Sequence, residues 1–359
     1  MSVINEDIRD ASSDNKESQK KHKDGVTMAE ALNMALFHEM RADASVVVYG
    51  EDVGKNGGVF RVTKGLFNEF GEARVIDSQL DEVSIAGVSI GMGAKGVKAV
   101  AEFQFSGFGW SAYDQIYNHA SRLRTRTRGR LTCPVVYRMP CGGGIGAPEH
   151  HSESVEAPFA HIPGLRVVVP SSPKRAYGLL LAAIRDPDPV IFLEPTRMYR
   201  NAKEDVADNG EALPLDKCFV LREGSDITLV SWGSSLIETL QAAEGLQDEG
   251  ISAEVIDVAT IKYLDEETIL SSVEKTGACV IVHEAPQICG FGAEIAAVLA
   301  EKGLYSLFAP VKRVAGFDVP MPLKGLEYEY IPSVERIAHH AREAYKVSRD
   351  MRKTWARFL

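Results

Sequence analysis

Short continuous apolar runs alternate with helical patterns along most of the chain. In the first half, such runs lie at 46–49, 97–103, 135–138, 165–169 and 190–193. Strands of this kind are typical of parallel sheets covered on both faces, because neither face of the strand then meets water. The pattern therefore predicts an α/β fold with doubly wound sheets.

Helix signals lie between these runs. Thr27 and Glu30 form the capping-box pattern T-x-x-E, and apolar residues at helical spacing continue to about Met40. Further helices are expected at 111–126 and 173–184. Helices that follow strands in this way can cover the sheet on both sides.

A polar segment containing Gly and Pro, residues 201–215, separates two such units and is expected to be a linker. The tail at 1–25 is polar and charged and is expected to be disordered. The first domain is then 26–200, and the second, 216–359, repeats the alternation. Its expected strands are 227–231, 253–258, 280–283 and 311–314, and its expected helices are 235–249, 266–274, 293–302 and 333–349.

Composition argues against several classes of protein. The chain has 50 acidic and 40 basic residues, a net charge of −10, which disfavours general nucleic-acid binding. No run approaches the ~18 apolar residues that span a bilayer, and the first residues lack the apolar core of a signal peptide. Five widely spaced cysteines without a CxxC pair favour reduced thiols of a cytoplasmic protein over disulfides or a zinc site.

The stretch 76–93, IDSQLDEVSIAGVSIGMG, joins two acids, Asp81 and Glu82, to a run of small and apolar residues. This run has no polar face, which predicts a helix buried all round. Glu82 would then lie at the mouth of a buried helix, where poor contact with water raises the pKa of a carboxyl group. The alternative is an acid that only stabilises the first turn of the helix.

A glycine-rich loop, PCGGGIGAPEHHSE at 140–153, follows an expected strand end, where active-site loops of α/β sheets lie. His150 and His151 close this loop. A histidine there can move protons near neutral pH, and no spacing of ligand-type residues supports a metal. His283 also stands at a strand end, but its domain has no other candidates.

Two glycine patterns invite a nucleotide interpretation. Residues 91–96 match G-x-G-x-x-G, but they end a helix and precede a strand, which is the wrong context. Gly290 and Gly292 do follow a strand and open a helix, although Ile295 replaces the third glycine. They leave a nicotinamide oxidoreductase open as a distant alternative.

A dense and ordered set of motifs resembles a known family, from about residue 26 to the C-terminus. The chain is similar to the β subunit of heterodimer-type 2-oxoacid dehydrogenases, the thiamine-diphosphate-dependent decarboxylating components of the pyruvate, branched-chain 2-oxoacid and acetoin complexes. The resemblance implies a pyrimidine-binding domain followed by a transketolase C-terminal-type domain. The motifs are GEDV, GGVFRVTKGL, LDEVSIAGVSIGMG, AEFQF, YDQIYNHA, HHSES and PGLRVVVPSSP.

The resemblance assigns roles by position. Glu82 matches the glutamate that hydrogen-bonds N1′ of the cofactor's aminopyrimidine and drives deprotonation of C2 of the thiazolium. Leu80 matches a backbone contact to the pyrimidine, and Gln104 and Phe108 match residues of the same pocket. His151 matches the histidine that assists substrate binding and acylation of the lipoyl group.

The sequence departs from the family pattern at two residues, and the family also binds two kinds of ion. Phe108 stands where some relatives have Tyr, and Glu153 stands where many have Gln, which adds a negative charge near the site. Some relatives bind potassium in this subunit, and Asp186 and Asp188 lie in the matching turn. The family's pyrophosphate and Mg²⁺ site rests on a GDG motif of the α subunit, and this sequence contains no GDG.

The resemblance implies an assembly of two α and two β chains that decarboxylates a 2-oxoacid and acylates a lipoyl acyltransferase core. FLEPTRMYR and GGVFRVTKGL favour branched-chain 2-oxoacids, with pyruvate as the alternative. A transketolase-like or synthase relative would need the pyrophosphate half in the same chain, and a non-catalytic scaffold subunit would not need Glu82 and His151. Candidates for contact with the acyltransferase are Asp318, Glu327, Glu329 and the helix at 333–349.

Overall fold

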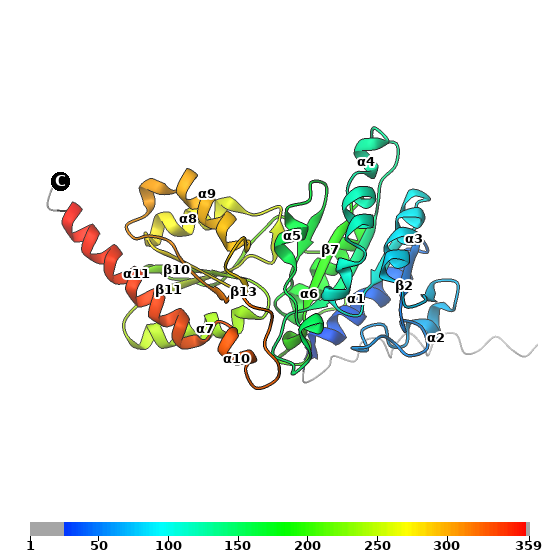
Figure 1. The fold of residues 1–359 in the computed structure, drawn as a ribbon, viewed down its shortest axis with the longest axis horizontal. Coiled ribbons are helices and arrows are strands. Elements are labelled where there is room, and N and C mark those ends of the chain that lie inside the picture. The colour runs from blue at the N-terminus through cyan, green and yellow to red at the C-terminus, as the bar shows by residue number, and fades with distance from the viewer. Residues whose placement is uncertain (1–24, 357–359) are drawn as a thin grey trace, which may run out of the picture.

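The computed structural model describes residues 25–356, so the tail expected at 1–25 lies outside the described residues except for Gly25. The chain forms two α/β halves side by side, one around a seven-stranded sheet and one around a five-stranded sheet (Figure 1). The prediction of an α/β fold with two doubly wound sheets is confirmed.

The first sheet has the strand order β12-β6-β7-β5-β4-β2-β3, and all neighbours are parallel except β12 and β6. The five strands expected from the apolar runs are present with small shifts at their ends, as β2 (Val46–Gly50), β4 (Lys98–Glu102), β5 (Val135–Cys141), β6 (Arg166–Val168) and β7 (Val190–Pro195). Two further strands, β3 (Val75–Asp77) and β12 (Thr260–Lys262), complete the sheet.

Helices cover both faces of this sheet. α1 (Met28–Ala42) and α6 (Pro173–Arg185) pack together on one face, in a core that includes Val136. α3 (Glu82–Ala94) and a π-helical segment, Gln115–Ala120, belong to the core on the other face. α1 begins as predicted, because the Thr27 hydroxyl accepts from Glu30 N at 3.4 Å and the Glu30 carboxylate accepts from Thr27 N at 2.8 Å.

The second sheet has the order β14-β13-β10-β11-β9, with β9 antiparallel to β11. α7 and α11 pack in a core on one face, and α8 and α9 belong to the core on the other. The strands are β9 (Phe219–Arg222), β10 (Ile227–Ser231), β11 (Ala253–Asp257), β13 (Cys279–Pro286) and β14 (Lys312–Gly316). The helices are α7 (Ser235–Asp248), α8 (Glu266–Thr276), α9 (Gly292–Lys302) and α11 (Val334–Trp355).

The two halves share a strand and a core. β12 comes from the chain beyond the expected linker, yet it pairs with β6 of the first sheet. One buried apolar cluster also runs from Ile85 of α3 to Leu299 of α9. The shorter elements are β1 (Val26–Thr27), β8 (Lys203–Glu204), α2 (Leu66–Phe70), α4 (Leu123–Arg126), α5 (Glu156–Ala160) and α10 (Glu327–Tyr330).

Two helix predictions are wrong. The single helix expected at 111–126 is broken, because Ser121 N bonds Ile116 O five residues back and the chain turns before α4 begins. α3 is not buried all round, since Ile85, Ala86 and Ile90 face the core while Val83 and Val88 remain exposed. Among the described residues, no helix is both long and apolar enough to cross a bilayer.

Candidate active site at the strand ends

The predicted site residues follow strands β3, β4 and β5 of the first sheet. β2 lies between β3 and β4, and Gly50 at its end stands opposite Asp77 of β3 and Glu102 of β4. Parallel strands end at the same edge of a sheet, so the segments after them lie near one another. Glu82 follows β3, and Gln104 and Phe108 follow β4. The structure therefore places these three residues at one edge.

The two acids before α3 have different positions. Asp81 is the N-cap, and its carboxylate accepts from Ser84 N at 3.3 Å and from the Ser84 hydroxyl. These hydrogen bonds lower the pKa of Asp81. Glu82 is the first helical residue and is half-buried, and within residues 25–356 its carboxylate accepts no hydrogen bond. The capping role therefore belongs to Asp81, and the oxygens of Glu82 remain available.

Glu51 is a site residue that the sequence did not single out. It follows β2 directly and is buried, and its Oε1 has no hydrogen-bond partner. Burial raises the pKa of Glu51, and the nearby charges of Glu82 and Asp52 raise it further. The GED motif at the end of a strand can be seen in the sequence, but the burial of Glu51 depends on how other strands pack. The edge thus carries carboxyl groups that can accept hydrogen bonds and hold a proton.

An aromatic wall borders these acids. Gln104 Nε2 donates to Asp52 Oδ2 at 3.5 Å, which connects the ends of β4 and β2. The His151 ring packs edge-on against Phe105 and Phe108, with ring centroids 4.4 and 5.2 Å apart. His151 Nδ1 is buried and has no hydrogen-bond partner. The structure therefore brings Gln104, Phe108 and His151 together.

A buried ion cluster underlies this edge. Arg138 of β5 donates to Glu102 Oε2 of β4 at 2.5 Å and to both carboxylate oxygens of Glu194 of β7, at 2.7 and 2.8 Å. Burial alone would lower the pKa of Arg138, but the two carboxylates outweigh it and raise the pKa. Burial raises the pKa of Glu102. The cluster joins three strands beneath the site, and sequence analysis did not find it.

The side chain of Glu153 contacts Trp110 and His150. Its carboxylate accepts from Trp110 Nε1, and its Oε1 lies 3.9 Å from His150 Nδ1. His150 itself points outward, with 67% of its side chain exposed. Of the two loop histidines, only His151 belongs to the aromatic wall.

Asp186 and Asp188, which lie in the turn where a potassium site is expected, already have cationic partners. Asp186 Oδ2 lies 2.7 Å from Arg166 Nε, and Asp188 Oδ1 accepts from Arg124 Nε at 2.6 Å. These guanidinium groups would repel a cation, so the two side chains do not fit a potassium ion. A site built from main-chain oxygens of the same turn remains a prediction.

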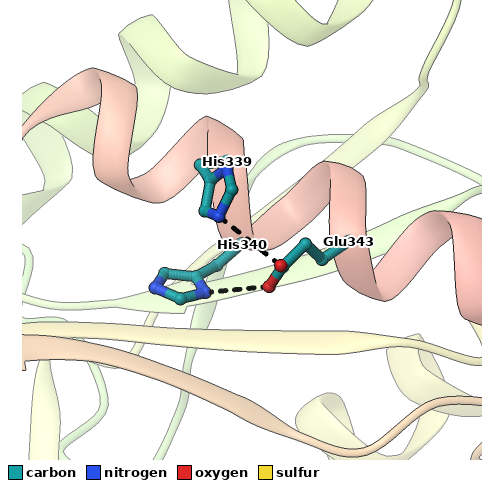
Figure 2. Close-up of side chains that lie close together, drawn as sticks. All are labelled: His339, His340 and Glu343. Atoms are coloured by element: carbon teal, nitrogen blue, oxygen red, sulfur yellow. Dashed lines mark ion pairs between the residues drawn. The ribbon is translucent and has the colours of Figure 1, made fainter.

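Ligand-type side chains also meet on α11, away from the strand ends. Figure 2 shows His339 and His340 beside Glu343, with His339 Nε2 to Glu343 Oε1 at 3.5 Å and His340 Nδ1 to Oε2 at 3.4 Å. Lys312 Nζ also lies 3.4 Å from Glu343 Oε2, and the three ligand-type side chains are largely exposed. A metal would have to displace this ammonium group, so the cluster is better described as an ion-pair network.

Close packing against His283, rather than nucleotide binding, explains why glycines stand at positions 290 and 292. A Cβ at either position would lie 2.7 Å from the ring of His283. That ring is fully buried and stacks on Trp232, with centroids 5.1 Å apart. The glycines make room for the histidine, which removes the observation behind a nicotinamide site. All five cysteines are free, as expected.

Comparisons with known proteins agree with this architecture. Residues 24–202 match the family model "Transketolase, pyrimidine binding domain", and residues 216–337 match "Transketolase, C-terminal domain". The chain is 47% identical over 321 residues to a pyruvate dehydrogenase E1 component subunit beta of Acholeplasma laidlawii, covering 89% of this chain and 98% of that protein. It is 43% identical to the protein of the same name from Bacillus subtilis strain 168, over 89% and 98% of the two chains.

Solved structures show the same fold. A split-gene transketolase, described as an inactive β4 tetramer, superposes with a TM-score of 0.75 at 24% identity, over 90% of this chain and 99% of that chain. A transketolase variant from Pichia stipitis has a TM-score of 0.67 at 14% identity, over 91% of this chain and 47% of that one. At this level of identity, the likeness concerns the fold alone.

Proposed function

Because the chain belongs to the β subunits of 2-oxoacid dehydrogenase E1 components, a transketolase-type family, we propose that it joins an α subunit to form a pyruvate-decarboxylating E1 enzyme. The observation that carries this proposal is the gathering of Glu82, Gln104, Phe108 and His151 at one sheet edge. A scaffold subunit would have no need of this arrangement.

We propose pyruvate, rather than branched-chain 2-oxoacids, as the substrate. The relatives named above are called pyruvate dehydrogenase subunits, and the sequence stretches that favoured the branched-chain family have structural roles. In FLEPTRMYR, Glu194 binds Arg138 and Tyr199 is buried against Phe60. These side chains belong to the core, so they provide no evidence about the acyl chain.

Thiamine diphosphate is the cofactor of this family, and the edge residues suit its pyrimidine half. Glu82 offers an unengaged carboxylate, Gln104 an amide, and Phe108 an apolar surface. When bound, the cofactor supplies the carbon nucleophile for the 2-oxo group. In this proposal Glu82 holds and releases a proton at N1′, and the main chain at Leu80 contacts the pyrimidine. Mg²⁺ and the pyrophosphate belong to the α subunit.

An α subunit is also favoured by the surface beside Glu82. Leu80 is 83% exposed, and the exposed side of α3 carries Val83 and Val88 next to small residues. Apolar groups beside a candidate active site are typical of a surface that a partner covers. Two α and two β chains would then enclose the cofactor between unlike subunits.

His151 is proposed to serve acylation of the lipoyl group carried by the acyltransferase core. Its aromatic neighbours hold the ring at the site, and its buried Nδ1 has no hydrogen-bond partner within the described chain. An imidazole in such a place can donate or accept the proton that moves when an acyl group is transferred.

Co-expression with an α subunit, followed by assays over a panel of 2-oxoacids, tests the proposal. We expect the complex to bind thiamine diphosphate and to have its highest kcat/KM with pyruvate, while the isolated β chain is inactive. A higher kcat/KM with branched-chain acids would restore the alternative substrate. Turnover by the isolated chain would contradict the shared active site.

A further inference from the structure

The glycine-rich loop that carries His151 is held by carboxylates from the second half of the molecule. Gly143 N donates to Glu284 Oε1 at 2.6 Å. Gly144 N donates to Glu327 Oε1 at 3.0 Å, and Gly146 N donates to both oxygens of Glu327, at 3.0 and 3.1 Å. Glu284 lies near the end of β13 and Glu327 begins α10, so both belong to the second half of the molecule.

The loop has the backbone shape that this contact requires. Gly142, Gly144 and Gly146 have positive φ values of +82°, +84° and +74°, whereas the residues between them do not have positive φ. Alternation of this kind turns successive amides toward one concave side, where an anion can bind. A Cβ at Gly144 would also lie 2.4 Å from Arg197 Cδ. The three glycines therefore serve capture of the loop by carboxylates.

Glu327 is suited to this task by its burial. It is only 3% exposed, and its two oxygens receive three amide hydrogen bonds. Hydrogen bonds to a charged acceptor are stronger than neutral ones, and loss of the carboxylate leaves the partly buried amides of Gly144 and Gly146 unsatisfied. The expectation that Glu327 contacts the acyltransferase is therefore unsupported by its position, because its carboxylate faces the loop.

The contact reaches His151 through a short, closed segment. Gly142 N bonds Glu153 O at 3.0 Å, and Ser154 Oγ bonds Glu284 Oε1 at 3.3 Å, so the base of the loop is pinned on both sides. Across the loop, the backbone of Gly107 packs closely against His150, because a Cβ at Gly107 would lie 2.2 Å from His150 O. His151 meets Phe105 and Phe108 from this segment.

We infer that Glu327, supported by Glu284, is a positioning residue for His151: the second domain holds the loop so that the imidazole stays against the aromatic wall. The inference rests on the function proposed for His151, and it adds that the C-terminal domain sets the geometry of the acyl-transfer step.

The experiment uses the complete E1 complex with its α subunit. Hydrogen exchange is measured on peptides covering 142–154, and two activities are assayed, acylation of a lipoyl domain and turnover with an artificial electron acceptor. The variants are Glu327→Ala, His151→Ala and the double variant. Glu244→Gln, an exposed carboxylate on α7 of the same domain, is the control.

In Glu327→Ala we expect loop amides to exchange about tenfold faster or more, and lipoyl acylation to fall by about tenfold, because hydrogen bonds to a buried charge are lost. Turnover with the artificial acceptor should fall less. The double variant should be no worse than His151→Ala alone, since both changes act through the same imidazole. Glu244→Gln should match the parent protein.

Unchanged loop exchange in Glu327→Ala would overturn the inference, and so would additive losses in the double variant, which indicate a route that bypasses His151. If His151→Ala retains full acylation, the role proposed for His151 is wrong, and loop exchange alone then decides whether Glu327 holds the loop. Should Glu327→Ala fail to assemble, Glu327→Gln replaces it, because the amide keeps the shape and one acceptor oxygen.

Discussion

The imidazole ring of His151 stands edge-on to the phenyl ring of Phe105, with centroids 4.4 Å apart and planes at 67°. Phe105 follows β4, whereas His151 ends the glycine-rich loop after β5. The contact therefore joins two loops at the carboxyl edge of the sheet. It also leaves Nδ1 buried without a protein partner, so the ring is held by its faces and edges while its nitrogens remain available for chemistry.

Replacement of His151 by Ala should separate two activities of the E1 complex. Lipoyl acylation should fall by the ~10²-fold that loss of an acid–base group costs, while turnover with an artificial acceptor should fall less. His150→Ala is the matched control, because its neighbouring ring is largely exposed. Equal losses in both variants would argue that the loop, rather than the His151 imidazole, is what the reaction needs.

Replacement of Arg138 by Met should destabilise the chain severely. The substitution leaves Glu102 and Glu194 buried without their cation, which costs roughly 3–5 kcal/mol of unfolding free energy. Arg124→Met removes the more exposed pair with Asp188 and should cost under ~1 kcal/mol. Urea unfolding of the two variants provides the comparison. Similar losses would show that the buried cluster contributes no more than a surface pair.

His283 should make the chain less stable in acid. Burial lowers the pKa of His283 from 6.5 to about 4, so between these values the unfolded chain binds a proton that the folded chain does not. Stability contributed by this group is therefore present above pH 6.5 and is lost as the pH falls toward 4, by ~3 kcal/mol in total. Buried carboxyl groups with raised pKa values, such as Glu156 and Glu284, act in the opposite sense.

The measurement is the unfolding free energy of parent and His283→Leu chains between pH 7 and 4.5. The carboxyl effects are common to both proteins and cancel in the difference, so the variant should lose less stability on acidification. His339→Leu, with 62% of that histidine side chain exposed, should follow the parent. Parallel curves for His283→Leu and the parent would mean that His283 titrates normally in the folded chain.

Local sequence signals located most of the fold, because they are read from neighbouring residues. The capping box at Thr27 and the apolar run at 135–138 needed no knowledge of the rest of the chain. The broken helix after Ser111 was missed because its π-helical turn is set by packing against α3. The pairing of β12 with β6 was missed for the same kind of reason, since it joins segments about ninety residues apart in the chain.

The site was predicted unevenly. The resemblance supplied Glu82, Gln104, Phe108 and His151, and the strand ends explain why they lie at one edge of the sheet. Glu51 was passed over because a GED motif does not reveal its own burial, and Glu327 was named only as a candidate for contact with the acyltransferase, although its side chain is buried. In both cases the role of the carboxylate depends on segments distant in sequence, which composition and periodicity do not record.

The last prediction separates the two acids that begin α3. Asp81 carries the capping hydrogen bonds, so Asp81→Ala should lower the melting temperature by a few degrees, as loss of an N-cap does. Glu82 makes no such bond, so Glu82→Gln should leave the melting temperature nearly unchanged. If Glu82 instead relays a proton to the cofactor, the same substitution should affect chemistry.

The readout is hydrogen–deuterium exchange at C2 of thiamine diphosphate bound to the complete complex. In Glu82→Gln, exchange should slow by at least ~10²-fold, because the amide keeps the shape and a hydrogen-bonding group but cannot pass a proton. Cofactor affinity should fall less, since the pyrophosphate is held by the α subunit. In Asp81→Ala, exchange should stay close to the parent rate. A parent-like rate in Glu82→Gln would reduce this residue to a carboxylate at the start of a helix, and the proton relay would have to be sought at Glu51.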